Sequence, residues 1–116
     1  MNANHSLFFG WNKVIPGKEK LAMELHGKML KFWGEQKAEG KIENFIPCQL
    51  SAHNGDLNGF FLITGPRETL LDLRWNNEAV IGMHLEANML LENYACIDGY
   101  VGESLEQIMG MWSQKI

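Results

Sequence analysis

The stretch SLFFGWNKVIPGKE, residues 6–19, decides how this chain begins its fold. In a strand over residues 6–14, Leu7, Phe9 and Trp11 lie on one face and Phe8 lies on the other. Because both faces carry aromatic side chains, the pattern indicates a central strand that is covered on two sides. Pro16-Gly17 then ends the strand, and Lys18-Glu19 opens a helix.

The helix that follows is predicted over residues 18–37, and Gly40 is its natural stop. Its apolar residues recur at helical spacing and form the stripe Leu21, Leu25, Met29 and Phe32. Gly27 and Gly34 destabilise a helix interior, which favours either close helix packing or room for a ligand at these two positions.

A second strand is predicted over residues 42–52 and a third over residues 58–64. Pro47 cannot donate a backbone hydrogen bond, so the second strand belongs at an edge of the sheet. Asn54-Gly55 between the two strands is the pair preferred in tight hairpin turns. The pattern therefore predicts an antiparallel hairpin.

Two helices, a strand and a closing helix complete the pattern. The first helix covers residues 68–74, and the second runs to about residue 91 with an asparagine of Asn76-Asn77 as its cap. A strand follows over residues 94–101. The closing helix carries the apolar residues Leu105, Ile108, Met109 and Trp112.

This order is that of an α+β, ferredoxin-like βαββαβ domain with an extra C-terminal helix, over residues 1–116. Right-handed crossovers place the first and third strands in the middle of the sheet and the other two at its edges. Helices cover only one face of such a sheet. We therefore expect a partner to cover the other face.

Composition excludes several classes of protein. The 116 residues are 46% hydrophobic and only 21% charged, with a net charge of −4, against about 25% charged residues in typical proteins. The absence of a basic cluster argues against nucleic-acid binding. No apolar run approaches the roughly 20 residues of a membrane span, and residues 1–7 do not resemble a signal peptide. Two cysteines without CxxC spacing indicate reduced thiols in the cytoplasm, and no metal-ligand spacing occurs.

The turn Pro16-Gly17-Lys18-Glu19 resembles one that is common in the dimeric α+β barrel superfamily. The stretch at residues 75–79 (WNNEA), followed by His84, is similar to the second helix of its antibiotic-biosynthesis monooxygenases and haem-degrading relatives. The resemblance covers most of residues 6–101 and extends to uncharacterised bacterial members. It implies a homodimer in which two open sheet faces form a barrel.

Haem-degrading relatives use an asparagine, a tryptophan and a histidine, to which Asn12, Trp75 and His84 are the nearest matches here. When His84 and Glu78 are aligned, Trp75 falls one position off that pattern, and Asn12 lies closer to the Pro-Gly turn than in the family. Haem is therefore an alternative, and the main expectation is that no cofactor is needed.

Three residues are catalytic candidates. His84 falls on the apolar side of its helix, and His26 borders the stripe of the first helix. Imidazoles at such positions can move protons near neutral pH, and Asn12 could stabilise an oxyanion. The alternatives are a core histidine bonded to the backbone and a boundary histidine half in water.

The candidate ligand-lining side chains are Trp11, Phe9, Phe60, Trp75, Met83 and Met29. Aromatic and methionine side chains around a few polar groups are typical of small-ligand pockets, although packing within the core is the alternative. The predicted ligand is a small hydrophobic or amphipathic molecule, such as an aromatic polyketide-like compound or a fatty acid. The predicted activity is cofactor-independent monooxygenation or isomerisation, with a non-catalytic ligand-binding or interaction module as the alternative.

Overall fold

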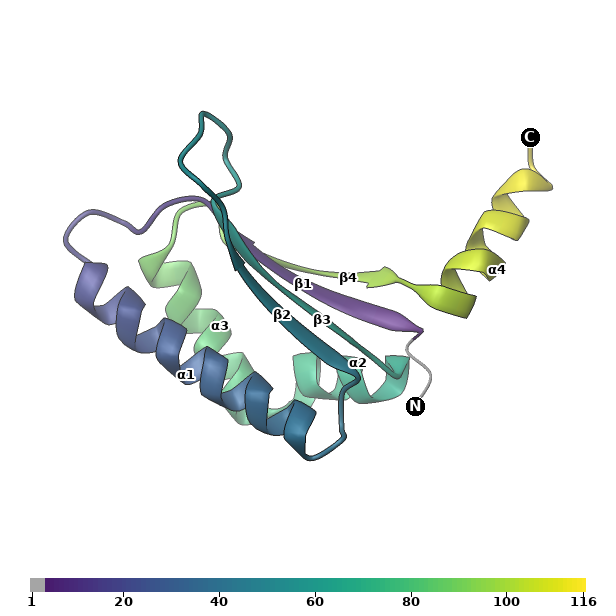
Figure 1. The fold of residues 1–116 in the computed structure, drawn as a ribbon, viewed down its shortest axis with the longest axis horizontal. Coiled ribbons are helices and arrows are strands. Elements are labelled where there is room, and N and C mark those ends of the chain that lie inside the picture. Colours follow the sequence, from purple (N-terminus) through teal and green to yellow (C-terminus); the bar gives the residue numbers. More distant parts are fainter. Residues whose placement is uncertain (1–3) are drawn as a thin grey trace.

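The computed structural model describes residues 4–116 (Figure 1). The elements in chain order are β1 (His5–Trp11), α1 (Glu19–Ala38), β2 (Asn44–Gln49), β3 (Gly59–Gly65), α2 (Arg67–Asn76), α3 (Glu78–Leu90), β4 (Ala95–Tyr100) and α4 (Gly102–Ser113). This is the predicted ferredoxin-like order, with the helix pair α2–α3 at the second helical position and α4 as the extra helix. None of the helices in residues 4–116 is both long and apolar enough to cross a membrane.

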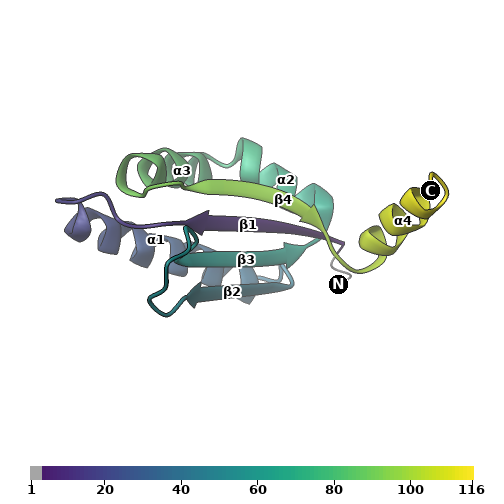
Figure 2. The ribbon, with the colours of Figure 1, turned by 90° about the horizontal axis from the view of Figure 1, so that it is seen from above.

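The four strands form one antiparallel sheet in the order β2-β3-β1-β4 (Figure 2). The prediction that the first and third strands are central is thus confirmed, as is the edge position of β2, the strand that contains Pro47. In the register of the central pair, Leu7 lies opposite Ile63 and Phe9 lies opposite Phe61. These four side chains share the face that the helices cover.

α1, α2 and α3 all lie on one face of the sheet (Figure 1), and the core fills the space between them and the strands. Trp33 of α1 is fully buried and packs its ring against Phe9 and Phe32. The predicted stripe of α1 is partly wrong, because Leu21 is 50% exposed. Leu25 and Met29 are buried as predicted, whereas Ala22 and Trp33 take the places of Leu21 and Phe32, so the buried set is Ala22, Leu25, Met29, Trp33 and Gln36.

β1 ends at Trp11, three residues earlier than predicted, because the chain there leaves β3 and pairs with the segment after α3. Asn12 N–H donates to the Glu92 carbonyl at 2.9 Å, and Glu92 N–H donates to the Lys13 carbonyl at 2.7 Å. Gly17 then adopts a φ of +88°, which a residue with a Cβ rarely takes. Its N–H donates to the Glu19 carboxylate at 3.2 Å, and backbone hydrogen bonds lower the pKa of that carboxyl.

The predicted break between the two helices after β3 is confirmed, and Asn77 is the capping residue. Its side-chain oxygen accepts a hydrogen bond from the Val80 N–H at 3.1 Å, which satisfies one donor of the first turn of α3. This cap fixes the start of α3 and, with it, the inward direction of His84.

The connection between β2 and β3 is longer than the predicted tight hairpin. It covers residues 50–58 and projects from the sheet, away from the helices (Figure 1). The ring of His53 organises it: Nδ1 accepts from the Gly55 N–H, and Nε2 lies 2.8 Å from the Leu57 carbonyl. The Asn-Gly pair therefore turns the tip of a loop and does not join the strands directly.

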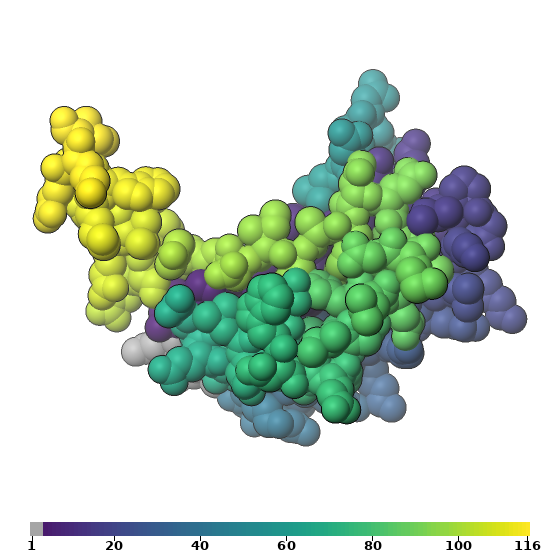
Figure 3. All heavy atoms as spheres, turned by 180° about the vertical axis from the view of Figure 1, so that it is seen from behind, coloured from purple at the N-terminus to yellow at the C-terminus, as the bar shows by residue number. Residues whose placement is uncertain are grey.

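The second face of the sheet carries no helix of residues 4–116. By the strand register it presents Phe8, Ile46, Cys48, Phe60, Leu62, Ala95 and Ile97. Phe8 and Phe60 stack with ring centroids 5.4 Å apart, and Ile97 is 58% exposed. We call these seven residues the open face. Two projections flank it, the 50–58 loop and α4 (Figure 3).

Candidate functional site

A cavity of about 170 Å³ lies between α1 and the sheet. Eight apolar side chains and two polar ones line it: Trp11, Val14, Ala22, Met23, Leu25, Met29, Phe61, Leu91, His26 and Gln49. α1 brings five of them: residues 22, 25, 26 and 29 recur on its sheet-facing side, and Met23 adds a fifth at the rim. Two predicted ligand-lining residues, Trp11 and Met29, therefore belong to this cavity.

His26 is the ionisable side chain among the ten residues that line the cavity. Its ring contacts Trp11 and Phe61, with centroids 6.2 and 5.3 Å away. Burial lowers the pKa of His26, so its imidazole is neutral at pH 7. Since no hydrogen bond to the ring occurs within residues 4–116, one donor and one acceptor nitrogen remain for a ligand.

The wall of the cavity formed by Trp11 depends on a glycine in the neighbouring strand. Gly59 lies opposite Trp11 in the register, and a Cβ on Gly59 would come within 2.5 Å of the indole ring. Only a residue without a side chain lets the indole lie flat over β3 at this position. The indole also meets the Phe61 ring edge-on at 5.1 Å.

A polar hollow adjoins the cavity and shares Trp11, Val14 and Gln49 with it. Asn12 also lines this hollow, where its Oδ1 accepts a hydrogen bond from the Asn58 side-chain amide. That bond leaves the two amide hydrogens of Asn12 without a side-chain partner in the described part of the chain. Asn12, predicted as an oxyanion donor, thus lies beside the cavity and has donors to offer.

His84 lies elsewhere, on α3 and facing β4. It is only 9% exposed, its Nδ1 is 2.6 Å from the Tyr94 hydroxyl, and its ring meets Phe9 edge-on at 5.6 Å. Burial, with a smaller effect from the Arg74 charge, lowers the pKa of His84 to about 4. Burial likewise raises the pKa of Tyr94, so both partners are neutral at pH 7.

The structure does not bring the two predicted histidines together. The ring contacts of His26 are with Trp11 and Phe61, whereas those of His84 are with Phe9 and Tyr94. Phe9 itself is 2% exposed and packs between Trp33 and His84 as a core residue. Neither His84 nor Phe9 lines the cavity.

Three other predicted ligand-lining residues also lie outside the cavity. Phe60 is on the open face, because neighbouring residues of a strand point to opposite sides. Met83 lines a groove between α1 and α3, at the rim of which Lys28 pairs with Glu86 at 2.8 Å. Trp75 is 63% exposed at the end of α2, with the Arg74 guanidinium 4.1 Å from its ring centroid.

The residues nearest to the haem pattern do not form one site. Asn12 bonds to Asn58, His84 bonds to Tyr94, and Trp75 stacks with Arg74. No hydrogen bond or ring contact joins any two of Asn12, Trp75 and His84 within residues 4–116. An axial imidazole must reach the iron freely, but the ring of His84 is only 9% exposed and contacts the rings of Phe9 and Tyr94.

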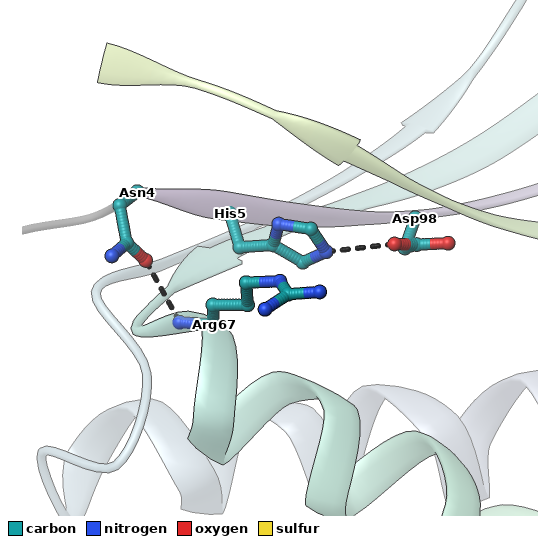
Figure 4. Close-up of polar contacts among 4 residues, drawn as sticks. All are labelled: Asn4, His5, Arg67 and Asp98. Atoms are coloured by element: carbon teal, nitrogen blue, oxygen red, sulfur yellow. Dashed lines mark hydrogen bonds and ion pairs between the residues drawn. The ribbon is translucent and has the colours of Figure 1, made fainter. Parts of the chain in front are cut away.

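A buried histidine that the sequence analysis missed joins β1 to β4 through the exposed side chain of Asp98 (Figure 4). His5 is 1% exposed, and its Nε2 lies 2.8 Å from the carboxylate of Asp98. The Arg67 side chain runs beneath the ring, while the Arg67 N–H donates to the Asn4 side chain at 2.8 Å. His5 has the same strand parity as Leu7, which was the available signal. Neither His5 nor Asp98 lines the cavity; their pair ties β1 to β4, while the Asn4 side chain bonds to the start of α2.

Cys48 and Cys96 are free thiols on the two edge strands, as predicted. Burial raises the pKa of Cys96 to about 11. A thiol that keeps its proton at neutral pH is a weak nucleophile. Gly27 and Gly34 do not mark close packing, because a Cβ at either position would meet no atom within 4 Å.

Comparison with known proteins identifies the fold. No protein-family model matches the chain, and no curated protein matches it in sequence. A dimeric protein of unknown function and ferredoxin-like fold from Bacteroides fragilis is similar in structure, with 12% identity, a TM-score of 0.59, and coverage of 84% of this chain and 96% of that one. A Pseudomonas aeruginosa protein has 18% identity and a TM-score of 0.58, with coverage of 88% and 97%. These similarities show the ferredoxin-like fold; the resemblance to monooxygenases stays a prediction.

Proposed function

We propose that this chain forms a homodimer through its open face and binds a small amphipathic molecule in the cavity beneath α1. The observation that carries the proposal is the lining of the cavity, where eight apolar side chains surround the neutral imidazole of His26 and the Gln49 amide. An apolar space with a few convergent polar groups is the usual make-up of a ligand site.

The size of the cavity limits the ligand. An apolar cavity of about 150 Å³ accommodates benzene, whereas drug-sized ligands occupy about 300–1,000 Å³. The 170 Å³ beneath α1 therefore suits one small aromatic ring system or a short alkyl group. A larger amphipathic molecule fits with its apolar end between Trp11 and Met29 and its polar end in the hollow beside Asn12.

The dimer is supported by the composition of the open face. Phe8, Ile46, Phe60, Leu62 and Ile97 are the large apolar side chains on a surface that no helix of residues 4–116 covers. Contiguous apolar surface of this kind marks interaction sites in soluble proteins. A second copy supplies an identical flat apolar face, and the similar protein from Bacteroides fragilis is dimeric. Sheet-to-sheet pairing leaves the cavity on the helical side free for its ligand.

Binding of indole tests the ligand site, because indole has one apolar bicyclic ring system and a single N–H donor. We expect isothermal titration calorimetry to show saturable binding to the full chain. Ala22→Leu, which places a larger side chain in the cavity, is expected to weaken binding at least tenfold. Ala38→Leu, an exposed position of the same helix, is the matched control and should bind as the unmodified chain does.

Two results would contradict the ligand proposal. One is the absence of any heat of binding with indole up to millimolar concentration. The other is equal affinity in the Ala22→Leu and unmodified chains, which would put the indole elsewhere. Native mass spectrometry of freshly purified protein complements the titration, since a retained small molecule would identify the chemical class of the natural ligand.

Isomerisation of the bound ligand is a second candidate function, favoured by the neutral imidazole of His26 in the cavity. One nitrogen can remove a proton from a carbon acid and return it to another carbon, so neither a cofactor nor an oxidant is consumed. Monooxygenation would in addition need dioxygen and electrons from the substrate. Hydrogen–deuterium exchange into candidate ketones tests the idea: His26→Gln should abolish exchange, and an unchanged rate would exclude His26 as the base.

A further inference from the structure

α4 has an apolar side that its own chain leaves open. At 100° per residue, Leu105, Ile108, Met109 and Trp112 fall within a narrow arc, and Leu105, Met109 and Trp112 are 41–60% exposed. No residue of α4 is buried within the described chain. We call these four residues the α4 stripe.

Apart from the exposed Met111, the other side of α4 is polar and carries Glu103, Glu106 and Gln107, and Gln114 follows as the C-cap. Helices that bind membrane surfaces carry Lys and Arg on their polar side. The acidic side of α4 would be repelled by anionic lipid, which makes a protein surface the better partner for the α4 stripe.

The position of α4 indicates which protein surface the α4 stripe contacts. α4 follows β4 directly, redirected by Gly102 with a φ of +58°, and its main contact within the chain is with β4. It stands on the same side of the sheet as the open face (Figure 1) and beyond the ends of the strands (Figure 2). Figure 3 shows the concave surface between α4 and the 50–58 loop. A molecule that covers the open face therefore meets α4 at one end.

A free helix of this length is also poorly stable. α4 has 12 residues, and isolated helices of fewer than about 12–15 residues are marginal in water. In globular proteins most helical stability comes from packing of the apolar side. The α4 stripe needs a surface, and the chain's own core does not supply one.

We infer that α4 is an exchanged arm: the α4 stripe of each copy packs against the other copy when the open faces pair. This inference rests on the proposed dimer and adds a second contact to it. Two-fold symmetry gives each copy one arm and one receiving surface, so the exchange closes at two copies.

The area of the open face supports this arm. Four strands about 4.8 Å apart and about seven residues long cover roughly 440 Å², while a standard interface takes about 800 Å² from each partner. A helix about 18 Å long and about 10 Å wide adds roughly 180 Å². Because each copy both gives and receives an arm, the addition is about 360 Å² per copy and brings the interface to the standard size.

The experiment compares two full-length double variants by sedimentation equilibrium. Met109→Glu with Trp112→Glu places two charges in the α4 stripe, and Gln107→Glu with Gln114→Glu places one charge on the opposite side of the same helix and one at its C-cap. We expect the stripe variant to raise the dimer dissociation constant at least tenfold and the control variant to change it less than threefold. Hydrogen exchange should show the α4 amides protected in the dimer and unprotected in the stripe variant.

The outcomes separate the arm from the dimer itself. A dimeric chain whose stripe variant dissociates as the unmodified chain does would overturn the arm and leave the paired open faces intact. An unmodified chain that is monomeric up to 100 µM would overturn the proposed dimer and the arm with it. α4 contributes nothing to the buried core, so each variant should unfold as a monomer at the same melting temperature as the monomeric unmodified chain. Thermal unfolding followed by circular dichroism measures this.

Discussion

The burial of His84 predicts how the stability of the protein changes with pH. In the folded protein the pKa of His84 is lowered from 6.5 to about 4, because the imidazole is enclosed by Phe9 and Tyr94 and feels the positive charge of Arg74. In the unfolded chain the group titrates near 6.5. Between pH 4 and pH 6.5 the unfolded state therefore binds more protons than the folded state. The free energy of unfolding must rise with pH across that window and fall as the solution is acidified.

The size of the effect follows from the displacement of the pKa. Each pH unit corresponds to about 1.36 kcal/mol, so the full displacement is worth about 3 kcal/mol. Water near the outer edge of the imidazole screens part of this, and we expect about 1–2 kcal/mol to be lost between pH 6.5 and pH 4. The loss from His26, whose pKa is also lowered by burial, has the same sign.

Urea unfolding at pH 7.0, 6.0, 5.0 and 4.0 measures this effect. His84→Gln keeps a polar partner for the Tyr94 hydroxyl and removes the titrating imidazole. Between pH 7.0 and pH 4.0 this variant should therefore lose about 1–2 kcal/mol less unfolding free energy than the unmodified protein. Tyr94→Phe, which removes the hydroxyl partner but keeps the enclosed imidazole, is the matched control and should keep the pH dependence of the unmodified protein. If the His84→Gln and unmodified proteins lose stability in parallel, the imidazole is not desolvated in the folded state and the reasoning is wrong.

Three further predictions concern the sheet and α1. Ile97→Lys should leave the fold of each copy stable, because this side chain is 58% exposed in a single copy. In the dimer it would bury an unpaired charge, so the dissociation constant measured by sedimentation should rise about thirtyfold or more. Leu85→Lys is the control: this side chain is 63% exposed on α3, and the substitution should leave sedimentation unchanged. Gly59→Ala should destabilise the fold by about 1–3 kcal/mol, since its Cβ forces the Trp11 ring to move, and an unchanged urea midpoint would contradict this. Gly27→Ala should raise the free energy of unfolding by about 0.5–1 kcal/mol, because the new methyl group meets no atom and improves helix propensity; a lower melting temperature would argue against the open space at this position.

Local patterns in the sequence were sufficient for the architecture. Aromatic side chains on both faces of residues 6–11 predicted that β1 is central, Pro47 predicted the edge position of β2, and the Asn76-Asn77 pair predicted the start of α3. Each of these signals acts through the residue's own backbone or its immediate neighbours. They do not depend on how distant elements pack.

The candidate site was predicted less well, because its lining depends on how α1 is rotated about its axis and on which face of the sheet each strand residue lies. At the start of α1 the buried position is one residue later than predicted, since Leu21 is exposed and Ala22 is buried. His26, predicted at the border of the stripe, faces the cavity. The aromatic set was too broad, since strand parity alone separates Phe60 from Phe61. Which histidine meets the cavity depends on how α1 and α3 lie over the sheet, and no local pattern encodes that.

The missed residues have similar causes. His5 lies at the first position of β1, where strand parity indicates an inward direction, but its partner Asp98 becomes apparent only from the register of β1 with β4. The position of α4 depends on surfaces outside its own helix. The amphipathic pattern in residues 102–113 predicted the helix correctly and contained no information about the side of the sheet on which it stands.

A crystal structure of the full chain soaked with indole shows whether the cavity beneath α1 is the ligand site. We expect density for one indole beneath α1, between Trp11 and Met29 and with its N–H within hydrogen-bonding distance of His26 or Gln49. Indole bound only on the open face, or only beside His84, would contradict the assignment of this cavity as the ligand site.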